Sequence, residues 1–305
     1  MITDLDNRII WFDGSLLHAQ EAKIYVMAPT AQFGLNVFEG IPVYHNSEKG
    51  ISYGFRLETH FNRLLNSARM LELHHQFSIK DMTKALCDVV KANGNDEDIV
   101  VRVILYAGGV ESWASDEPIG MIVSPMPRKK SNKEYTKNSL NCCFSSWRRI
   151  NEQVLSPKVK CGANYINSRL GQREALRNGY DTCIFLNEEG KISEGPGSCF
   201  FLVKDNVIIT PMITDSILNS ITRDTVLTIA KENGYKIEER QVDRTEAYIC
   251  DEAFLCGSSM GITSISRIDG YEMPKHNITD KLLSIYNKVV RGEEENYLKW
   301  LTPIQ

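Results

Sequence analysis

A single long polar stretch, "PRKKSNKEYTKNS", interrupts the 305-residue sequence and begins at Pro127. On both sides of it, segments with the apolar periodicity of helices alternate with apolar runs typical of strands. A loss of apolar residues combined with a gain of charge is typical of a connection between domains. We therefore expect a mixed α+β chain in two parts: an N-terminal α+β domain at 1–130, an interdomain loop at 131–138 and a C-terminal domain at 139–305.

Local patterns predict the elements of each part. "DG" at 13–14 separates two apolar runs, which predicts a β-hairpin. Apolar residues at helical spacing predict helices in "FRLETHFNRLLNSARMLEL" and in "FSIKDMTKALCDVVKANG", and "DIVVRVILYAG" has the β-branched content of a strand. In the second part, helices in "NSRLGQREALRNG" and "TRDTVLTIAKENG" and at 279–291 alternate with strands such as "EAFLCGSS".

Charge and composition exclude several classes of function. A net charge of −4 provides no general field that attracts nucleic acid. No apolar run reaches membrane-spanning length, and the first residues carry acids where a signal peptide needs basic residues. The eight cysteines contain no C-x-x-C pair and the six histidines are scattered, so we expect reduced thiols and no metal. These features predict a cytoplasmic protein without nucleic-acid or membrane partners.

Five features of the second part suit one kind of chemistry. Lys160 precedes a turn of small residues, Tyr165 follows it closely, and Glu194 lies in "KISEGPGS". "SITRD" at 220–224 begins a helix, and "GSS" at 257–259 ends an apolar strand. A lysine amine can bond an aldehyde, an anion can keep a pyridine nitrogen protonated, and a helix N-terminus can bind a phosphate. The set therefore suits a phosphorylated pyridine aldehyde.

Each feature also has an ordinary structural explanation. A single lysine is most often a solvated surface charge, and a glutamate flanked by glycine is most often a turn residue. "SITRD" is first of all a helix N-cap. The residues alone leave the cofactor and the structural explanations open.

Longer segments resemble a known family. The sequence resembles the class IV (fold-type IV) aminotransferases, which use pyridoxal 5'-phosphate, and within them the branched-chain amino-acid aminotransferases. The similarity runs nearly end to end. The segments that carry it are "FGLNVFEGIPVY", "FRLETHFNRLLNSARML", "SSWRRINEQVLSPKVKCGANYINS", "DTCIFLNEEGKISEG", "ITRDTVLTIAKENGYKIEER" and "DEAFLCGSSMGITSI". The resemblance implies a small N-terminal α+β domain, a larger C-terminal pseudo-barrel domain, and a homodimer in which a loop of the partner closes each pocket.

The resemblance also implies a role for individual residues toward the cofactor. Lys160 matches the lysine that bonds the cofactor and moves the substrate proton, and it is the implied catalytic residue. Glu194 matches the acid that faces the pyridine nitrogen, and Tyr165 matches the phenol beside the ring oxygen. The residues that match the family's phosphate contacts are Arg63, Ile221, Thr222 and Ser258.

A second set matches positions near the substrate. Ser259 would offer its backbone N–H to the substrate carboxylate, and Arg102 matches a strand arginine near the substrate. Phe38 and Gly40 match the pocket wall. The structural alternative for Arg102 is a buried ion pair, because a charge within an apolar strand must be paired.

The chain departs from the family mainly at substrate positions. Phe33 stands where the family commonly has tyrosine, Val100 replaces an aromatic residue, and Pro42 replaces an arginine. A tryptophan is missing from "SPMPRKK", the pattern before Thr222 reads "LNSIT", and Cys199 replaces an asparagine. Loss of hydroxyl and guanidinium groups changes which substrate groups can be paired, so the resemblance implies an altered substrate pocket.

We therefore predict an aminotransferase that moves an amino group between an L-amino acid and a 2-oxo acid, including the option of a specialised biosynthetic enzyme. One alternative is a lyase of the same fold, similar to the enzyme that acts on aminodeoxychorismate. A D-amino-acid transaminase is less favoured, because the arginine-x-histidine pattern of that group is absent at Arg102-Val103-Ile104. A non-catalytic homologue that binds a ligand is the remaining alternative.

Overall fold

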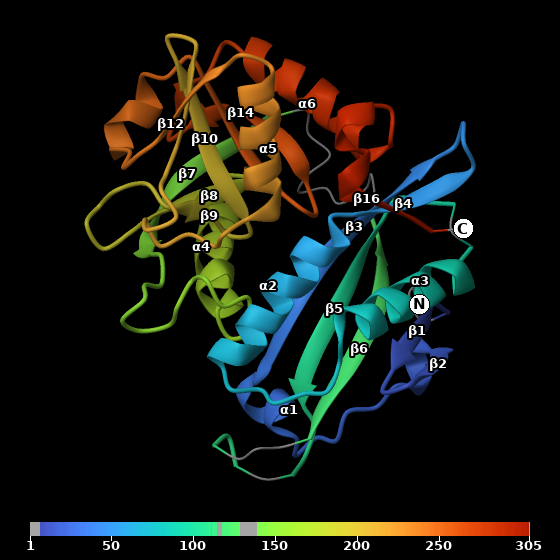
Figure 1. The fold of residues 1–305 in the computed structure, drawn as a ribbon. Helices are drawn as coiled ribbons and strands as arrows, with labels where there is room; N and C mark the ends of the chain where they lie inside the picture. Colours follow the sequence, from blue (N-terminus) through green and yellow to red (C-terminus); the bar gives the residue numbers. More distant parts are fainter. Residues whose placement is uncertain (1–6, 95, 111, 115–117, 129–138, 305) are drawn as a thin grey trace. The chain divides into compact units, whose positions relative to one another are not determined.

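The computed structural model describes residues 7–94, 96–110, 112–114, 118–128 and 139–304, which form two compact units (Figure 1). The first unit contains the described residues up to Arg128, together with 159–163 and 288–304. The second unit contains 139–158 and 164–287. The loop predicted at 131–138 lies outside the described residues. Two short stretches of the predicted C-terminal part therefore belong to the first unit, and the predicted boundaries stay a prediction.

The first unit begins with the predicted hairpin. Strands β1 (Ile9–Phe12) and β2 (Ser15–His18) pair antiparallel across a two-residue turn. Asp13 and Gly14 in this turn have φ values of 44° and 106°. Positive φ at both turn residues matches the right-handed twist of the strands, which is why "DG" is a strong hairpin signal.

Within the described residues, a seven-stranded sheet with the order β16-β4-β3-β5-β6-β1-β2 forms the body of the first unit. Its remaining strands are β3 (Asn36–Asn46), β4 (Ile51–Phe55), β5 (Ile99–Ala107), β6 (Ile119–Pro127) and β16 (Leu301–Ile304). The short helix α1 (Pro29–Phe33) leads into β3. The pairing of β16 with β4 brings the last described residues of the chain into the sheet of the first unit.

Helices α2 (Leu57–Met70) and α3 (Ile79–Ala92) confirm the two predicted helices and pack against this sheet (Figure 1). α2 packs against β3, and α3 packs against β1 and β6. The packed faces bury apolar side chains at helical spacing, among them Phe61, Leu64, Met82 and Leu86. Because strand side chains alternate between faces, only one face of β3 and β5 contributes to this core.

The second unit is built on a larger sheet. Among the described residues it has nine strands, with the order β12-β11-β10-β13-β14-β7-β8 and with β15 on β14 and β9 on β10. The strands are β7 (Ser139–Arg148), β8 (Thr182–Leu186), β9 (Glu194–Gly195), β10 (Ser198–Lys204), β11 (Val207–Thr210), β12 (Lys236–Glu239), β13 (Glu252–Gly257), β14 (Gly261–Ile268) and β15 (Tyr271–Glu272). Pairs β11–β12, β14–β7 and β7–β8 are parallel.

Helices α4 (Tyr165–Arg177) and α5 (Ile221–Glu232) cover this second sheet. α4 packs against β7 and β8, and α5 packs against β12 and β13. Gly179 and Gly234, which follow the two helices, have φ values of 82° and 79°. This left-handed conformation is common just beyond helix ends, which explains why glycine marked both ends in the sequence. Helix α6 (Asn277–Val290) confirms the last predicted helix.

Candidate functional residues in the two units

The segment that contains Lys160 lies beside the beginning of β3. The backbone N–H of Lys160 donates to Ser67 Oγ at 3.1 Å, and its carbonyl accepts from the N–H of Phe38 at 2.9 Å. Val37 and Cys161 form an antiparallel bridge. These contacts hold the backbone of Lys160 between α2 and β3.

The small residues after Lys160 have a structural cause. A Cβ on Gly162 would lie 2.8 Å from Asn36 Oδ1, so a larger residue would force the side chain of Asn36, at the start of β3, to move. Cys161 is buried in the core under α2. The small residues therefore allow this segment to approach β3 closely, which is a structural reason for them that does not depend on the role of Lys160.

The side chain of Lys160 lies over an aromatic ring. Its Nζ is 5.0 Å from the centroid of the Phe38 ring, and the Arg102 guanidinium is 5.3 Å from the same centroid. Both distances are within the range of cation–π contacts. Arg102 is exposed within this chain, so the alternative of a buried ion pair is wrong.

The register of β3 and β5 places the predicted substrate residues on one face of the sheet. Gly40 lies opposite Arg102, and Pro42 lies opposite Val100. Residues directly opposite each other share a face, and so do residues two apart along a strand. Phe38, Arg102 and the two replaced positions therefore face the side away from the helices. A Cβ on Gly40 would lie 3.3 Å from Val100 Cγ1, so these residues are also tightly spaced.

Arg63 is part of a buried ionic cluster on the opposite face of β3. Its Nε and Nη2 donate to Glu39 Oε1 and Oε2 at 2.6 and 2.8 Å, and His60 Nδ1 lies 2.7 Å from Oε2. Burial alone would raise the pKa of the Glu39 carboxyl, but Arg63 and His60 together hold it well below its usual range. Burial lowers the pKa of His60 despite the nearby Glu39 charge, so His60 is neutral near pH 7. The predicted phosphate arginine is thus held by a carboxylate, and its phosphate role stays a prediction.

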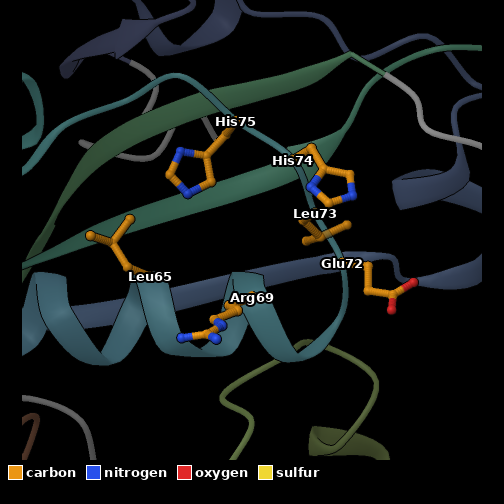
Figure 2. A pocket seen from close by; sticks show the side chains of 6 residues that line it. All are labelled: Leu65, Arg69, Glu72, Leu73, His74 and His75. Carbon is orange, nitrogen blue, oxygen red and sulfur yellow. The ribbon is translucent and has the colours of Figure 1, made fainter.

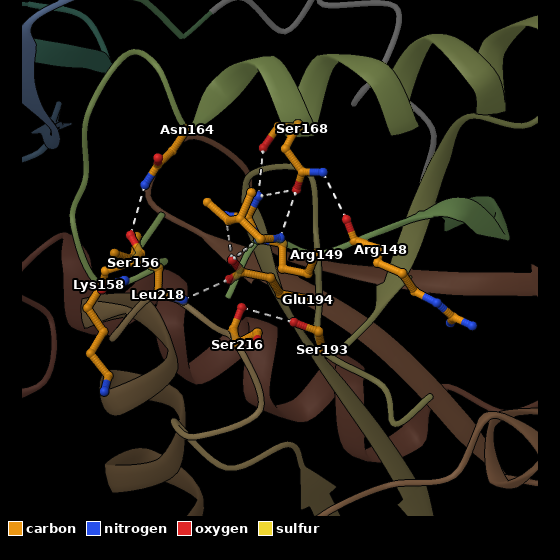
Figure 3. Close-up of polar contacts among 12 residues, drawn as sticks. Arg148, Arg149, Ser156, Lys158, Asn164, Ser168, Ser193, Glu194, Ser216 and Leu218 are labelled. Atoms are coloured by element: carbon orange, nitrogen blue, oxygen red, sulfur yellow. Dashed lines mark hydrogen bonds and ion pairs between the residues drawn. The ribbon is translucent and has the colours of Figure 1, made fainter. Parts of the chain in front are cut away.

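In the second unit, Glu194 is buried and paired with Arg149 (Figure 3). Nε and Nη2 of Arg149 both lie 2.9 Å from Glu194 Oε1. Arg149 in turn donates to Asn167 Oδ1 at 3.0 Å, which ties it to α4. A buried carboxylate needs such a partner, because an unpaired charge is strongly disfavoured away from water.

The other oxygen of Glu194 connects to the segment that leads into α5. The backbone N–H of Leu218 donates to Glu194 Oε2 at 3.2 Å (Figure 3). Ser220 caps α5 by accepting the N–H of Arg223 at 3.2 Å. Ile221 and Thr222 form the first turn of this helix, where backbone N–H groups have no partner within the helix. The acid and the predicted phosphate-binding turn are therefore joined by a short segment of one unit.

The remaining predicted residues of the second unit lie at element ends. Tyr165 is the first residue of α4, and Ser258 and Ser259 form the turn between β13 and β14. In the sheet, Cys199 pairs with Glu194 on one side and with Cys256 on the other. The register therefore connects the strand of Glu194, through β10, to the strand that leads to Ser258.

The first unit contains Arg63, Lys160 and the predicted substrate residues Phe38, Gly40 and Arg102. The second contains Tyr165, Glu194, Ile221, Thr222, Ser258 and Ser259. Sequence reasoning missed Glu39, His60 and Arg149. A signal existed for Glu39, because an acid between apolar strand residues needs a buried partner. Arg149 gave little signal, since its neighbour Arg148 is exposed.

A surface cavity of about 250 Å³ lies elsewhere in the first unit (Figure 2). Leu65 and Arg69 reach it from α2, and the segment that follows the helix contributes the other lining residues, Glu72, Leu73, His74 and His75. Burial lowers the pKa of His75. None of the predicted site residues lines this cavity.

Among the described residues, no group of three or more His, Cys, Asp or Glu side chains could hold a metal ion. The eight cysteines are all free thiols. The helices of the described ranges are all too short or too polar to cross a membrane.

Comparison with known proteins gives a consistent result. The family model described as amino-transferase class IV matches residues 36–268. The branched-chain-amino-acid aminotransferase of Pseudomonas aeruginosa is 32% identical over 303 residues, with 97% of each chain covered. A crystal structure of the branched-chain amino acid aminotransferase from Thermobaculum terrenum in its PLP (holo) form is 41% identical, covers 99% of this chain and 100% of that chain, and has a TM-score of 0.92. The branched-chain aminotransferase from Thermoproteus uzoniensis with norvaline is 36% identical, with 98% and 99% coverage and a TM-score of 0.93.

Proposed function

Because this chain belongs to the class IV aminotransferase family, we propose that it moves the amino group between an L-amino acid and a 2-oxo acid with a substrate preference of its own. The chain has the two-domain α+β fold of the fold-type IV aminotransferases, and its cofactor is pyridoxal 5'-phosphate. The observation that carries the proposal is the end-to-end similarity to a holo-form aminotransferase at 41% identity.

The donor chemistry of the two units fits this cofactor. Lys160 provides an amine beside an aromatic ring, and Glu194 provides a carboxylate that Arg149 stabilises as an anion. The first turn of α5 provides backbone N–H groups for a phosphate, with the hydroxyl of Thr222 as a further donor. When bound, pyridoxal 5'-phosphate supplies an aldehyde that bonds amines and a ring that withdraws electrons.

The residues have separate tasks in this proposal. Lys160 would move the proton between the substrate α-carbon and the cofactor, acting first as a general base and then as a general acid. Glu194 would face the pyridine nitrogen and keep it protonated, and Tyr165 would hydrogen-bond the ring oxygen. Arg63, Ile221, Thr222 and Ser258 would hold the phosphate, and Ser259 would bind the substrate carboxylate through its N–H.

The sheet face that carries Phe38 and Gly40 supports a distinct substrate preference. Arg102 provides an exposed positive charge on this face, next to the apolar Pro42 and Val100. A pocket discriminates strongly between substrates when one of them leaves a polar group without a hydrogen-bonding or charged partner. We therefore expect relative rates for acidic and branched-chain substrates that differ from those of enzymes with arginine and an aromatic residue at these two positions.

A homodimer in the cytoplasm completes the proposal. Tyr25, Val26 and Met27 form an exposed apolar run in the first unit, with 57, 74 and 49% of their surface accessible. Contiguous exposed apolar surface is typical of a protein interface, and we propose a second copy of this chain as the partner. The free thiols suit a reducing compartment.

A spectroscopic assay tests the proposal. Protein incubated with pyridoxal 5'-phosphate should show an absorbance band near the visible edge that borohydride removes, and Lys160→Ala should lack it. A screen of single amino acids should then convert the band to that of the amine form without any acceptor present. Pyruvate released without an acceptor would instead support the lyase, and a protein that never shows the band would refute the proposal.

A further inference from the structure

We propose that Glu39 is a positioning residue that holds the Arg63 guanidinium in place for the cofactor phosphate, with His60 holding Glu39 in turn. This inference rests on the proposed function, since it assigns a purpose to Arg63 as a phosphate-binding residue. It adds two residues that sequence reasoning did not assign to any role.

The geometry of the cluster is that of a clamp. Glu39 receives two N–H groups from Arg63 at 2.6 and 2.8 Å, the paired arrangement in which a guanidinium and a carboxylate share a plane. The carboxylate is fully buried, while Arg63 is slightly exposed, with 13% of its side chain accessible. A guanidinium is planar and has five N–H donors, so the two that bind Glu39 also fix the directions in which the others point.

His60 completes the clamp on the closed side. It lies one helical turn before Arg63 on α2, and its Nδ1 contacts the same oxygen that Arg63 Nη2 contacts. Its Nε2 is buried without a hydrogen-bond partner. A buried polar atom without a partner carries an energetic penalty, so a histidine at position 60 costs the protein some stability. That cost is consistent with a requirement for the contact of His60 with Glu39.

The charges of the three residues explain why the cluster would act by directing the Arg63 side chain and not by its net charge. Glu39 is negative, Arg63 is positive and His60 is neutral, so together they present almost no net charge to a phosphate. Arg63 can then contribute only through correctly directed hydrogen bonds. Removal of the Glu39 charge would increase the net positive charge of the cluster, but it would also release the Arg63 side chain to sample other rotamers.

The test compares two cofactor forms that differ only in the phosphate. Apoenzyme is titrated with pyridoxal 5'-phosphate and, separately, with pyridoxal, and each Kd is read from the absorbance band. For Glu39→Gln we expect a Kd for pyridoxal 5'-phosphate that is about tenfold higher, the scale on which partners of a binding side chain act. The Kd for pyridoxal should stay within about twofold, because Arg63 would contact only the phosphate.

Two kinds of control keep the test specific. Asp98→Asn changes another arginine-paired carboxylate of the same unit and should leave both Kd values unchanged. His60→Leu should weaken phosphate-dependent binding about threefold, and His60→Asn, which keeps an N–H near the Nδ1 position, should restore it. If Glu39→Gln does not fold, as judged by circular dichroism, this histidine pair decides the question.

Several results would overturn the proposal. Equal weakening of both cofactor forms would mean a general structural role, and tighter binding of pyridoxal 5'-phosphate by Glu39→Gln would mean that net charge dominates. His60→Asn behaving like His60→Leu would remove His60 from the clamp. If the unmodified protein binds neither form, the proposed function itself fails, which is a different result from any of these.

Discussion

Each unit contains a buried carboxylate paired with an arginine, but the partner with the proposed cofactor contact differs between the two pairs. In the first unit, Arg63 is the residue with a proposed cofactor contact and Glu39 is its support. In the second unit, Glu194 has the proposed cofactor contact and Arg149 is its support. The same ion pair can therefore present either a cation or an anion, depending on which partner reaches the site.

The supports also differ in their surroundings. Glu39 is fully buried and relies on Arg63 and His60, both on α2. Arg149 is held by Asn167 of α4 in addition to Glu194, and Glu194 also accepts from Leu218. The contacts of the second pair thus reach both α4 and the segment that leads into α5, and variants can test whether this connection matters.

Glu194→Gln should have the largest effect. It keeps the shape of the side chain but removes the anion, so we expect kcat to fall by about 10²–10³-fold, as for the loss of one preorganised electrostatic group. The cofactor should still bind. Glu39→Gln should instead mainly raise the Kd for the cofactor, and measurement of kcat and Kd for both variants would show whether the two pairs do different work. Similar losses of kcat in both variants would contradict the proposal that the two pairs have different roles.

Arg149→Met should reduce stability more than any surface change. It leaves Glu194 buried without its cation, and loss of one partner from a buried pair typically costs about 3–5 kcal/mol. Arg63→Met should cost less, because His60 still contacts Glu39 and the site of Arg63 is slightly open to solvent. Urea unfolding of the two variants gives this difference directly, and equal losses would contradict the proposed difference in surroundings.

Acid should weaken the first pair. The pKa of Glu39 is lower in the folded protein than in the unfolded chain, so its contribution to stability is complete above the unfolded value and is lost as pH falls toward the folded one. The free energy of unfolding should therefore decrease as pH falls below about 4–5. Glu39→Gln should show a shallower decrease over the same range. An unchanged slope would mean that Glu39 is not an ionised group in the folded state.

Ser220→Ala should have the smallest effect, and it should distinguish the contribution of the α5 N-terminus from that of the nearby ion pair. The Ser220 hydroxyl oxygen caps α5, and loss of such a cap typically costs about 1 kcal/mol. Because Leu218 and not Ser220 contacts Glu194, kcat should change little once the cofactor is saturating. A loss of kcat like that of Glu194→Gln would show that the helix end and the acid act as one site.

The sequence alone determined several secondary-structure elements and the family to which this protein belongs. The turn at Asp13–Gly14, the helices α2 and α3 and the glycines after α4 and α5 all follow from short-range patterns, because periodicity and backbone preference act over a few residues. Likewise, the residues proposed to contact the cofactor were named from segments that resemble a family.

Only the tertiary structure decided how those residues are supported. The pair of Glu39 and Arg63 joins residues 24 apart, and the pair of Arg149 and Glu194 joins residues 45 apart. Arg148 and Arg149 are adjacent in the sequence, yet one is exposed and the other is buried. Gly162 is small because Asn36 of a distant strand lies against it. Burial and pairing depend on which segments meet in space, and a local pattern carries no information about that.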